Sequence, residues 1–218
     1  MHRRPPAAPR PAEPHRVTIV TTCWGRDGDE RYLVTRLVAG ALLARAEVSI
    51  LHLTPVPGPF PVLRDGAFEV RQVLANSPSP MRQALMLAAI DPSRDLTTLP
   101  DEAAREIFAL EGGQTAEEIG GLLAATKPDA VVVAGLQQAW LASALRGLRP
   151  EPRVTVLPMT GRDARLRLAG YRDFLEVADS VGVLTTGERR SVIESAPDLA
   201  SGSIFDLPLR FPVNREAL

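Results

Sequence analysis

Apolar positions along the chain alternate between short β-rich runs and longer stretches with helical spacing. The strand-like runs are VTIVTTCW (17–24), VSILHL (48–53), FEVRQVL (68–74), AVVVAGL (130–136), RVTVLPM (153–159), SVGVLTT (180–186) and SIFDLPL (203–209). Between them the pattern predicts helices over 30–45, 80–90, 102–110, 115–126, 137–148, 163–179 and 188–196. Strands that alternate with helices indicate a parallel sheet covered on both faces. We therefore expect a Rossmann-like, doubly wound parallel sheet of about six or seven strands, in a three-layer α/β/α domain over residues 17–208.

Composition narrows the class of function. The 218 residues carry a formal net charge of −1, so the basic surface that nucleic-acid binding requires is absent. Lys127 is the only lysine among the 25 basic residues, which indicates a GC-rich genome, and we expect a bacterial source. The single cysteine, Cys23, excludes an intramolecular disulfide and fits a reducing, cytoplasmic compartment. Residues 1–16 are rich in Pro and Arg and have no apolar run, so we expect a disordered tail and no secretory signal.

Several well-known catalytic motifs are absent from the sequence. There is no G-x-x-x-x-G-K-[ST], no G-x-G-x-x-G after the first strand, and no G-x-S-x-G. The three histidines are scattered, and with one cysteine they form no zinc-ligand set, so no metal is expected. We interpret His52 as a packed sheet histidine and Cys23 as a buried thiol.

The corner GRDGDE, between the first strand and the first helix, is the strongest candidate site. A helix N-terminus favours anions, but Asp27, Asp29 and Glu30 already place negative charge there and would repel a phosphate. Asp29 can cap the helix, while Gly25 and Gly28 can adopt backbone angles that other residues avoid. Two interpretations stay open: a capped turn, or a carboxylate-lined pocket that accepts hydrogen bonds from the hydroxyls of a sugar or other polyol.

Four segments, in their order and spacing, resemble the N-terminal half of a GT-B glycosyltransferase of the family-4-like group. VTIVTTCWGRDGDERYLVTRLVAGALLARAEVSILHL is similar to that group's first strand, Gly-rich loop, helix and second strand. PDAVVVAGLQQ resembles its fourth-strand segment, and VADSVGVLTTGERRSVIE resembles its "Ala-Asp, apolar strand, Ser/Thr, acidic, Arg-Arg" segment. LPLRFPVNREAL resembles the link into the second half, so residues 209–218 are expected to lead toward a C-terminal half.

The resemblance implies the acceptor-binding half of an enzyme that transfers a sugar from a nucleotide-sugar donor. The acceptor, a sugar or a lipid or polyol, would contact Gly25, Asp27, Gly28, Asp29 and Gln137, and Thr186 and Glu188 would face the cleft between the halves. The donor would bind the C-terminal half or a partner chain. We therefore expect no cofactor on this chain and almost no turnover by it alone. Peripheral membrane contact through the basic tail is also compatible with the sequence.

One departure from the family pattern limits what can be carried over. Family members often have a histidine in the loop after the fourth strand, where this chain has Ala134, Gly135 and Gln137. No catalytic base can therefore be assigned. Two other classes stay open: a non-catalytic Rossmann-like binding or scaffolding module, and a small α/β enzyme of another kind, such as an epimerase or deacetylase.

Overall fold

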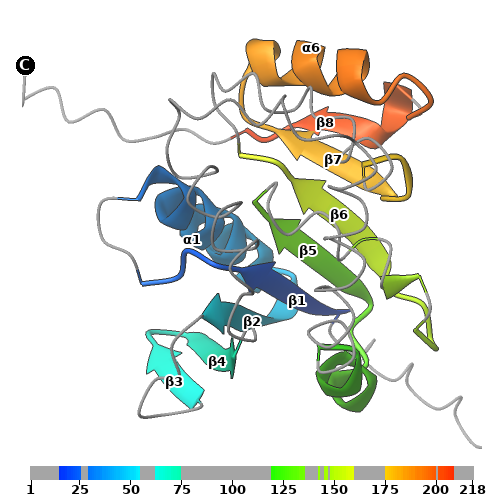
Figure 1. Ribbon diagram of the computed structural model, residues 1–218. Coiled ribbons are helices and arrows are strands. Elements are labelled where there is room, and N and C mark those ends of the chain that lie inside the picture. The colour runs from blue at the N-terminus through cyan, green and yellow to red at the C-terminus, as the bar shows by residue number, and fades with distance from the viewer. Residues whose placement is uncertain are drawn as a thin grey trace, which may run out of the picture.

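The computed structural model describes residues 15–25, 29–54, 62–74, 119–135, 142, 145–146, 148–159, 175–199 and 201–208. Within these ranges it has one sheet of eight strands in the order β3-β4-β2-β1-β5-β6-β7-β8 (Figure 1). The strands are β1 His15–Thr21, β2 Ala46–Thr54, β3 Val62–Asp65, β4 Phe68–Leu74, β5 Ala130–Ala134, β6 Arg153–Leu157, β7 Ser180–Val183 and β8 Ile204–Asp206. Helices α1 (Glu30–Leu43) and α6 (Thr186–Ser195) and a short 3-10 helix (Ser201–Ser203) accompany them.

Every neighbouring pair in this sheet is parallel except β3 and β4. The last four residues of β5, VVVA, are buried, as expected for a central strand that helices cover on both faces. The Rossmann-like fold that the sequence predicts is therefore confirmed. The predicted helices over 80–90 and 102–110 lie outside the described residues, as do residues 115–118 of the helix over 115–126 and most of the helices over 137–148 and 163–179.

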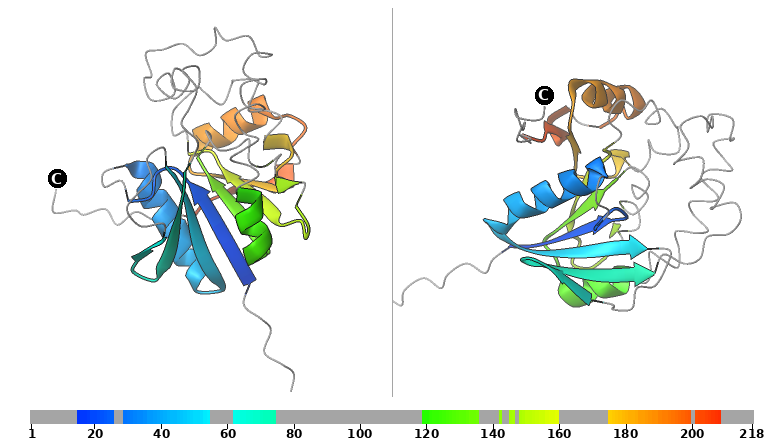
Figure 2. Two further views of the ribbon diagram at one scale, coloured as in Figure 1. Left: turned by 60° about the horizontal axis from the view of Figure 1, so that its bottom comes forward. Right: turned by 90° about the vertical axis from the view of Figure 1, so that its left-hand side faces the viewer.

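Two apolar cores lie on opposite faces of the sheet. On one face, α1 packs Tyr32, Val34, Val38 and Ala39 against sheet residues that include Ile19, Ile50 and Val70. On the other face, the helical segment 119–126 and α6 supply Ile119, Leu123 and Val192, which pack with Val20, Val133 and Val156. Figure 2 shows α1 and the segment 119–126 on opposite sides of the strands. This arrangement gives the expected three layers.

The β3–β4 hairpin is the element that the pattern did not predict. Asp65 and Phe68 pair across a two-residue loop, and Gly66 has φ +62°. A glycine at the first position of a two-residue loop, with positive φ, is typical of a hairpin turn. The dipeptide Asp65-Gly66 before a strand is the signal that could have predicted it. Arg36 of α1 donates to the Asp65 carboxylate at 3.2 Å and so holds the hairpin against the helix.

The boundary between β7 and α6 differs from the predicted one. The strand ends at Val183 instead of 186, and the helix begins at Thr186 instead of 188. Thr185 explains the difference, because its hydroxyl accepts the Glu188 N–H at 3.0 Å and caps the helix. The predicted start of the first strand also shifts, since β1 begins at His15.

Gly182 of β7 is closely surrounded by other side chains, which leave no room for a larger residue. A Cβ added there would stand 2.6 Å from Leu157 Cδ2 and 3.0 Å from Phe205 Cζ. Phe205 is partly exposed and can turn away, but Leu157 is 2% exposed and has little room to move. We expect Gly182→Ala to lower the free energy of unfolding by about 1–3 kcal/mol, measured by urea unfolding.

The matched control for this substitution is Gly121→Ala, on the exposed side of the segment 119–126. A Cβ at Gly121 would meet nothing within 4 Å. Because alanine is the better helix former, this change should raise stability by about 0.5–1 kcal/mol. Equal effects of the two substitutions would contradict the close contact at Leu157.

The carboxylate of Asp179, just before β7, is hydrogen-bonded to β6, and its pKa determines part of the pH dependence of stability. Its carboxylate accepts the Val154 N–H at 2.7 Å and pairs with Arg146 at 3.2 Å. Burial acts to raise the pKa of Asp179, but the Val154 N–H and the Arg146 guanidinium more than offset this and hold the pKa below its ordinary value. A lowered folded-state pKa gives stability that is present above the ordinary aspartate pKa and is lost as pH falls through the folded one.

Asp179→Asn should therefore lower the free energy of unfolding near neutral pH, and this loss should disappear in acid. Because the Asp179 side chain is 41% exposed and therefore partly screened by solvent, we expect a loss of about 1 kcal/mol at pH 7. The difference from the parent chain should shrink as pH falls below about 4. Urea unfolding of both chains across this range measures it, with Glu47→Gln, which changes an exposed carboxylate on β2, as the control. A difference that stays constant with pH would contradict the assignment.

Candidate functional site

The direction of the chain through the sheet reverses between β1 and β5. From β1 the chain moves outward through β2 and β4, and it then returns to β5 on the other side of β1. Thr21 and Ala134, the last residues of these two strands, pair in register. Ligands of open α/β sheets bind at the carboxyl ends of the strands at such a switch point. The candidate site therefore includes the described part of the loop after β1, the start of α1, and Gly135.

The loop after β1 begins with a buried cluster of hydroxyl and thiol groups. The Cys23 N–H donates to Thr21 Oγ1 at 3.2 Å, and the Cys23 thiol is hydrogen-bonded to the same oxygen at 3.0 Å. Thr35 of α1 lies 3.9 Å from that sulfur. Cys23 is 2% exposed, so the prediction of a buried thiol is confirmed. This cluster connects the end of β1 to α1.

Trp24 anchors the loop beneath α1. Its ring packs edge-on against Tyr32, with centroids 5.6 Å apart, and against Phe68, with centroids 5.4 Å apart. Only 5% of the residue is exposed. Gly25 follows at φ +73°, where the chain turns outward and where residues with a Cβ are strained. This backbone turn is what the structure assigns to Gly25, and its predicted contact with an acceptor stays a prediction.

Asp29 caps α1 and binds the side chain of Arg31. Asp29 Oδ1 accepts the Arg31 N–H at 2.9 Å and Arg31 Nε at 3.0 Å, and Oδ2 accepts Arg31 Nη2 at 2.8 Å. The hydrogen bond to Asp29 outweighs burial and raises the pKa of Arg31 above its ordinary value. Asp29 therefore acts as a cap, one of the two interpretations left open by the sequence. Its charge is neutralised, and both its oxygens are occupied.

Arg31 is the site residue that the sequence reasoning missed. Its side chain is 39% exposed beside the carboxyl end of β1, and Asp29 engages only Nε and Nη2. The remaining Nη1 can donate to a hydroxyl or phosphate oxygen. The Asp-x-Arg spacing at a helix start was the available signal. Because the guanidinium of Arg31 offsets the charge of Asp29, this corner carries less negative charge than Asp27, Asp29 and Glu30 alone would give it.

Two further residues at this edge have positive φ angles. Gly135 has φ +108° and donates its N–H to the Leu157 carbonyl at 2.8 Å, immediately after β5. Met159 has φ +54°, which is uncommon for a residue with a side chain, and its sulfur lies 3.9 Å from the Thr35 hydroxyl. Strained backbone of this kind gathers at functional sites. Met159 and Thr35 thus bring β6 and α1 together at the switch point.

The two residues predicted at an interdomain cleft lie at the start of α6. Thr186 is the exposed first residue of the helix. Glu188 is 1% exposed, and its Oε2 accepts the Leu184 N–H at 2.7 Å. Together with Thr185 it stabilises the helix start, in the manner of a capping box. These contacts lie within the start of α6 and do not test whether a second half of an enzyme packs against it. The cleft role of Thr186 and Glu188 therefore stays a prediction.

The other predicted acceptor residues, Asp27, Gly28 and Gln137, lie outside the described residues and also stay predictions. Among the residues that the structure describes, no group of three or more His, Cys, Asp or Glu side chains is placed to hold a metal ion. None of the helices in the described ranges is long and apolar enough to cross a membrane.

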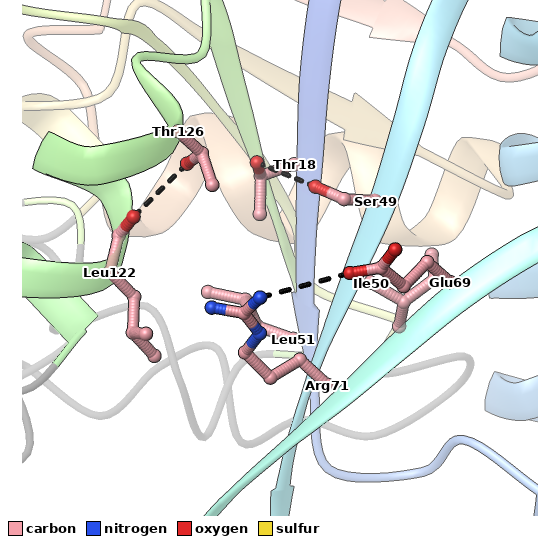
Figure 3. A pocket seen from close by; sticks show the side chains of 8 residues that line it. All are labelled: Thr18, Ser49, Ile50, Leu51, Glu69, Arg71, Leu122 and Thr126. Atoms are coloured by element: carbon pink, nitrogen blue, oxygen red, sulfur yellow. Dashed lines mark hydrogen bonds and ion pairs between the residues drawn. The ribbon is translucent and has the colours of Figure 1, made fainter. Parts of the chain in front are cut away.

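A cavity of about 30 Å³ lies beside the segment 119–126, which supplies Leu122 and Thr126 to its lining (Figure 3). It is lined by Thr18, Ser49, Ile50, Leu51, Glu69, Arg71, Leu122 and Thr126. The Thr18 and Ser49 hydroxyls are hydrogen-bonded at 3.0 Å, midway along β1 and β2. This volume accommodates a water molecule and is too small for a sugar. The cavity is also away from the carboxyl ends of the strands, so we do not assign it as the functional site.

Comparison with known proteins bears on the fold. The sequence matches no family model and no curated protein. Among solved structures, the sucrose-phosphate synthase of Thermosynechococcus elongatus has a TM-score of 0.60 at 13% identity, over 90% of this chain and 49% of that one. The α,α-trehalose 6-phosphate synthase of Burkholderia multivorans has a TM-score of 0.52 at 17% identity, over 83% and 43%. The UDP-forming α,α-trehalose-phosphate synthase of Burkholderia vietnamiensis has 0.50 at 15%, over 82% and 42%.

The chain has the fold of about half of these synthases. At such low identity the likeness concerns the fold alone. The chain spans less than half the length of each solved structure named above.

Proposed function

We propose that this chain is the acceptor-binding half of a glycosyltransferase that moves a sugar from a nucleotide-sugar donor. The fold likeness supports it, because all three neighbours are named as synthases of a sugar phosphate and one is named as UDP-forming. Release of UDP implies a UDP-linked donor for that synthase. In this chain, by extension, the donor would bind a second half or a partner chain.

The observation that carries the proposal is the arrangement at the switch point. Trp24 fixes the start of the loop, Gly25 turns it outward, and Asp29 orients the guanidinium of Arg31. The exposed part of Arg31 supplies a hydrogen-bond donor with a fixed direction. A hydroxyl or phosphate oxygen of an acceptor sugar is the matching group. The neutral Asp29–Arg31 pair also removes much of the repulsion that a sugar phosphate would otherwise meet there.

Thermal unfolding with three kinds of ligand tests this function. Monosaccharides and hexose 6-phosphates represent the acceptor, and UDP-glucose represents the donor. A ligand at about ten times its Kd adds about 1.4 kcal/mol, which raises Tm by about 3–6 °C in a chain of this size. We expect such a shift with at least one acceptor sugar and none with UDP-glucose.

Arg31→Gln should abolish the shift caused by the acceptor. The matched control is Arg190→Gln, on the exposed side of α6, which should keep it. A shift with UDP-glucose alone would contradict the acceptor-half assignment. The absence of a shift with every ligand would favour the non-catalytic binding module.

A further inference from the structure

Helix α1 presents an apolar stripe on the side that faces away from the sheet. Leu33, Leu37, Gly40 and Ala44 recur at intervals of three or four residues and are all exposed, with Leu33 47% and Leu37 38% exposed. Residues at this spacing share one side of a helix. We call these four residues the outward stripe. The opposite side of α1 is the one buried against the sheet.

Gly40 is the informative member of the outward stripe. A glycine inside a helix costs about 1 kcal/mol relative to alanine. A Cβ added at Gly40 would meet nothing within 4 Å, so no contact among the described residues requires the glycine. A missing side chain allows a second backbone to come close. The outward stripe therefore has a shape suited to another helix.

The stripe is complementary to itself. Its two leucines lie in the N-terminal half of the helix, and its two small residues lie at the C-terminal end. We propose that α1 pairs with α1 of a second copy of this chain, antiparallel and about a two-fold axis. Leu33 of one copy then packs against Ala44 of the other, and Leu37 packs against Gly40. A parallel pair would instead place leucine against leucine and small residues against small ones.

The charges at the ends of the stripe fit the same arrangement. Glu30 precedes the stripe, Arg45 follows it, and both side chains are exposed. In an antiparallel pair, Glu30 of one copy lies beside Arg45 of the other at both ends of the interface. The helix dipoles are opposed as well, which places each negative end near a positive end. In a parallel pair, like charges would meet instead.

The area of the proposed α1–α1 interface determines how tightly the two copies should bind. Fourteen helical residues span about 21 Å, and one helix from each copy covers less than the ~800 Å² per partner of a standard interface. We therefore expect a weak homodimer with a Kd in the micromolar range. This inference does not depend on the proposed function.

Sedimentation velocity from about 1 µM to about 500 µM chain measures the association. The parent chain should move from monomer to dimer over this range. Leu37→Glu should raise Kd by about tenfold or more, because it places a charge at the centre of the interface. The matched control, Ile193→Glu, changes a 49% exposed apolar residue on α6 and should leave Kd unchanged.

Gly40→Leu separates association from folding. No described atom lies within 4 Å of a Cβ added at Gly40, and leucine improves helix propensity, so Tm should stay or rise. The side chain would fill the space that the second helix needs, so Kd should rise by about tenfold. Charge reversal tests the antiparallel orientation of the two helices. Glu30→Arg and Arg45→Glu should each weaken the dimer, and the double variant should restore it.

Three outcomes would overturn the proposal. One is a parent chain that stays monomeric across the whole range. Another is a dimer whose Kd neither Leu37→Glu nor Gly40→Leu changes. The third is a monomer whose Tm falls on Leu37→Glu, which would mean that another part of the same chain covers the stripe.

Discussion

Replacing Trp24 with alanine is expected to lower the free energy of unfolding by about 3–5 kcal/mol. The ring is buried between α1 and the sheet, and it makes edge-on contacts with both Tyr32 and Phe68. Each such aromatic pair adds about 0.5–1.5 kcal/mol beyond the area that it buries. Domains have a total stability of about 5–15 kcal/mol, so the loss is a large fraction of it. Urea unfolding followed by circular dichroism measures the change.

Two comparison variants separate the aromatic contacts from burial in general. Trp24→Phe keeps a ring between Tyr32 and Phe68 and should lose about half as much as the alanine variant. Phe205→Ala removes a 39% exposed ring from the edge strand β8 and should cost less than about 1.5 kcal/mol. A loss below about 1 kcal/mol for Trp24→Ala would mean that the loop after β1 does not depend on this anchor.

Glu188→Ala is expected to lower the free energy of unfolding by about 2–3 kcal/mol. The substitution leaves the Leu184 N–H without its acceptor and removes a fully buried side chain from the start of α6. The Thr185 hydroxyl still caps the Glu188 position through the backbone, so the helix should form but fray at its first turn. Urea unfolding gives the total loss, and amide hydrogen exchange at the start of α6 locates it.

Glu188→Gln tests whether hydrogen bonding accounts for this loss. The amide oxygen can still accept from Leu184, so we expect a loss of about 1 kcal/mol. Arg190→Ala, on the exposed side of the same helix, is the matched control and should stay within about 0.5 kcal/mol of the parent chain. If Glu188→Gln costs as much as Glu188→Ala, the acceptor role of this carboxylate is refuted.

The strands could be predicted because their sequences carry strong local signals. The AVVVA run is apolar at every position, and its last four residues are buried, as in a central strand covered on both faces. The bounds of β4 agree with the predicted 68–74 although its signal is weaker, because the alternation of residues 68–71 is broken at Gln72 and Val73. β3 lacks both signals. It has four residues at the sheet edge, and Val62 and Leu63 are both exposed, so only the turn after it marks its presence.

The site could be predicted only in part, because it depends on side-chain contacts at the N-termini of α1 and α6. Asp29 was correctly predicted as a cap, because its type and position suffice. The side-chain pairing of Arg31 depends on the angle at which the loop enters α1, which the sequence does not specify. Glu188 was assigned from a family resemblance, although Thr185 and Glu188 have the spacing of a capping box. The inward turn of Trp24 depends on distant Phe68, and no local pattern encodes it.

The Asp29–Arg31 pair has a consequence for how a ligand would approach. Its charges lie 2.8 Å apart and cancel at longer range, so beyond a Debye length of about 8 Å the pair itself contributes almost no field. Arg31 would then act on an acceptor at short range and would add little electrostatic steering to the rate of association. Discrimination between acceptors would depend on the direction of hydrogen bonds at short range.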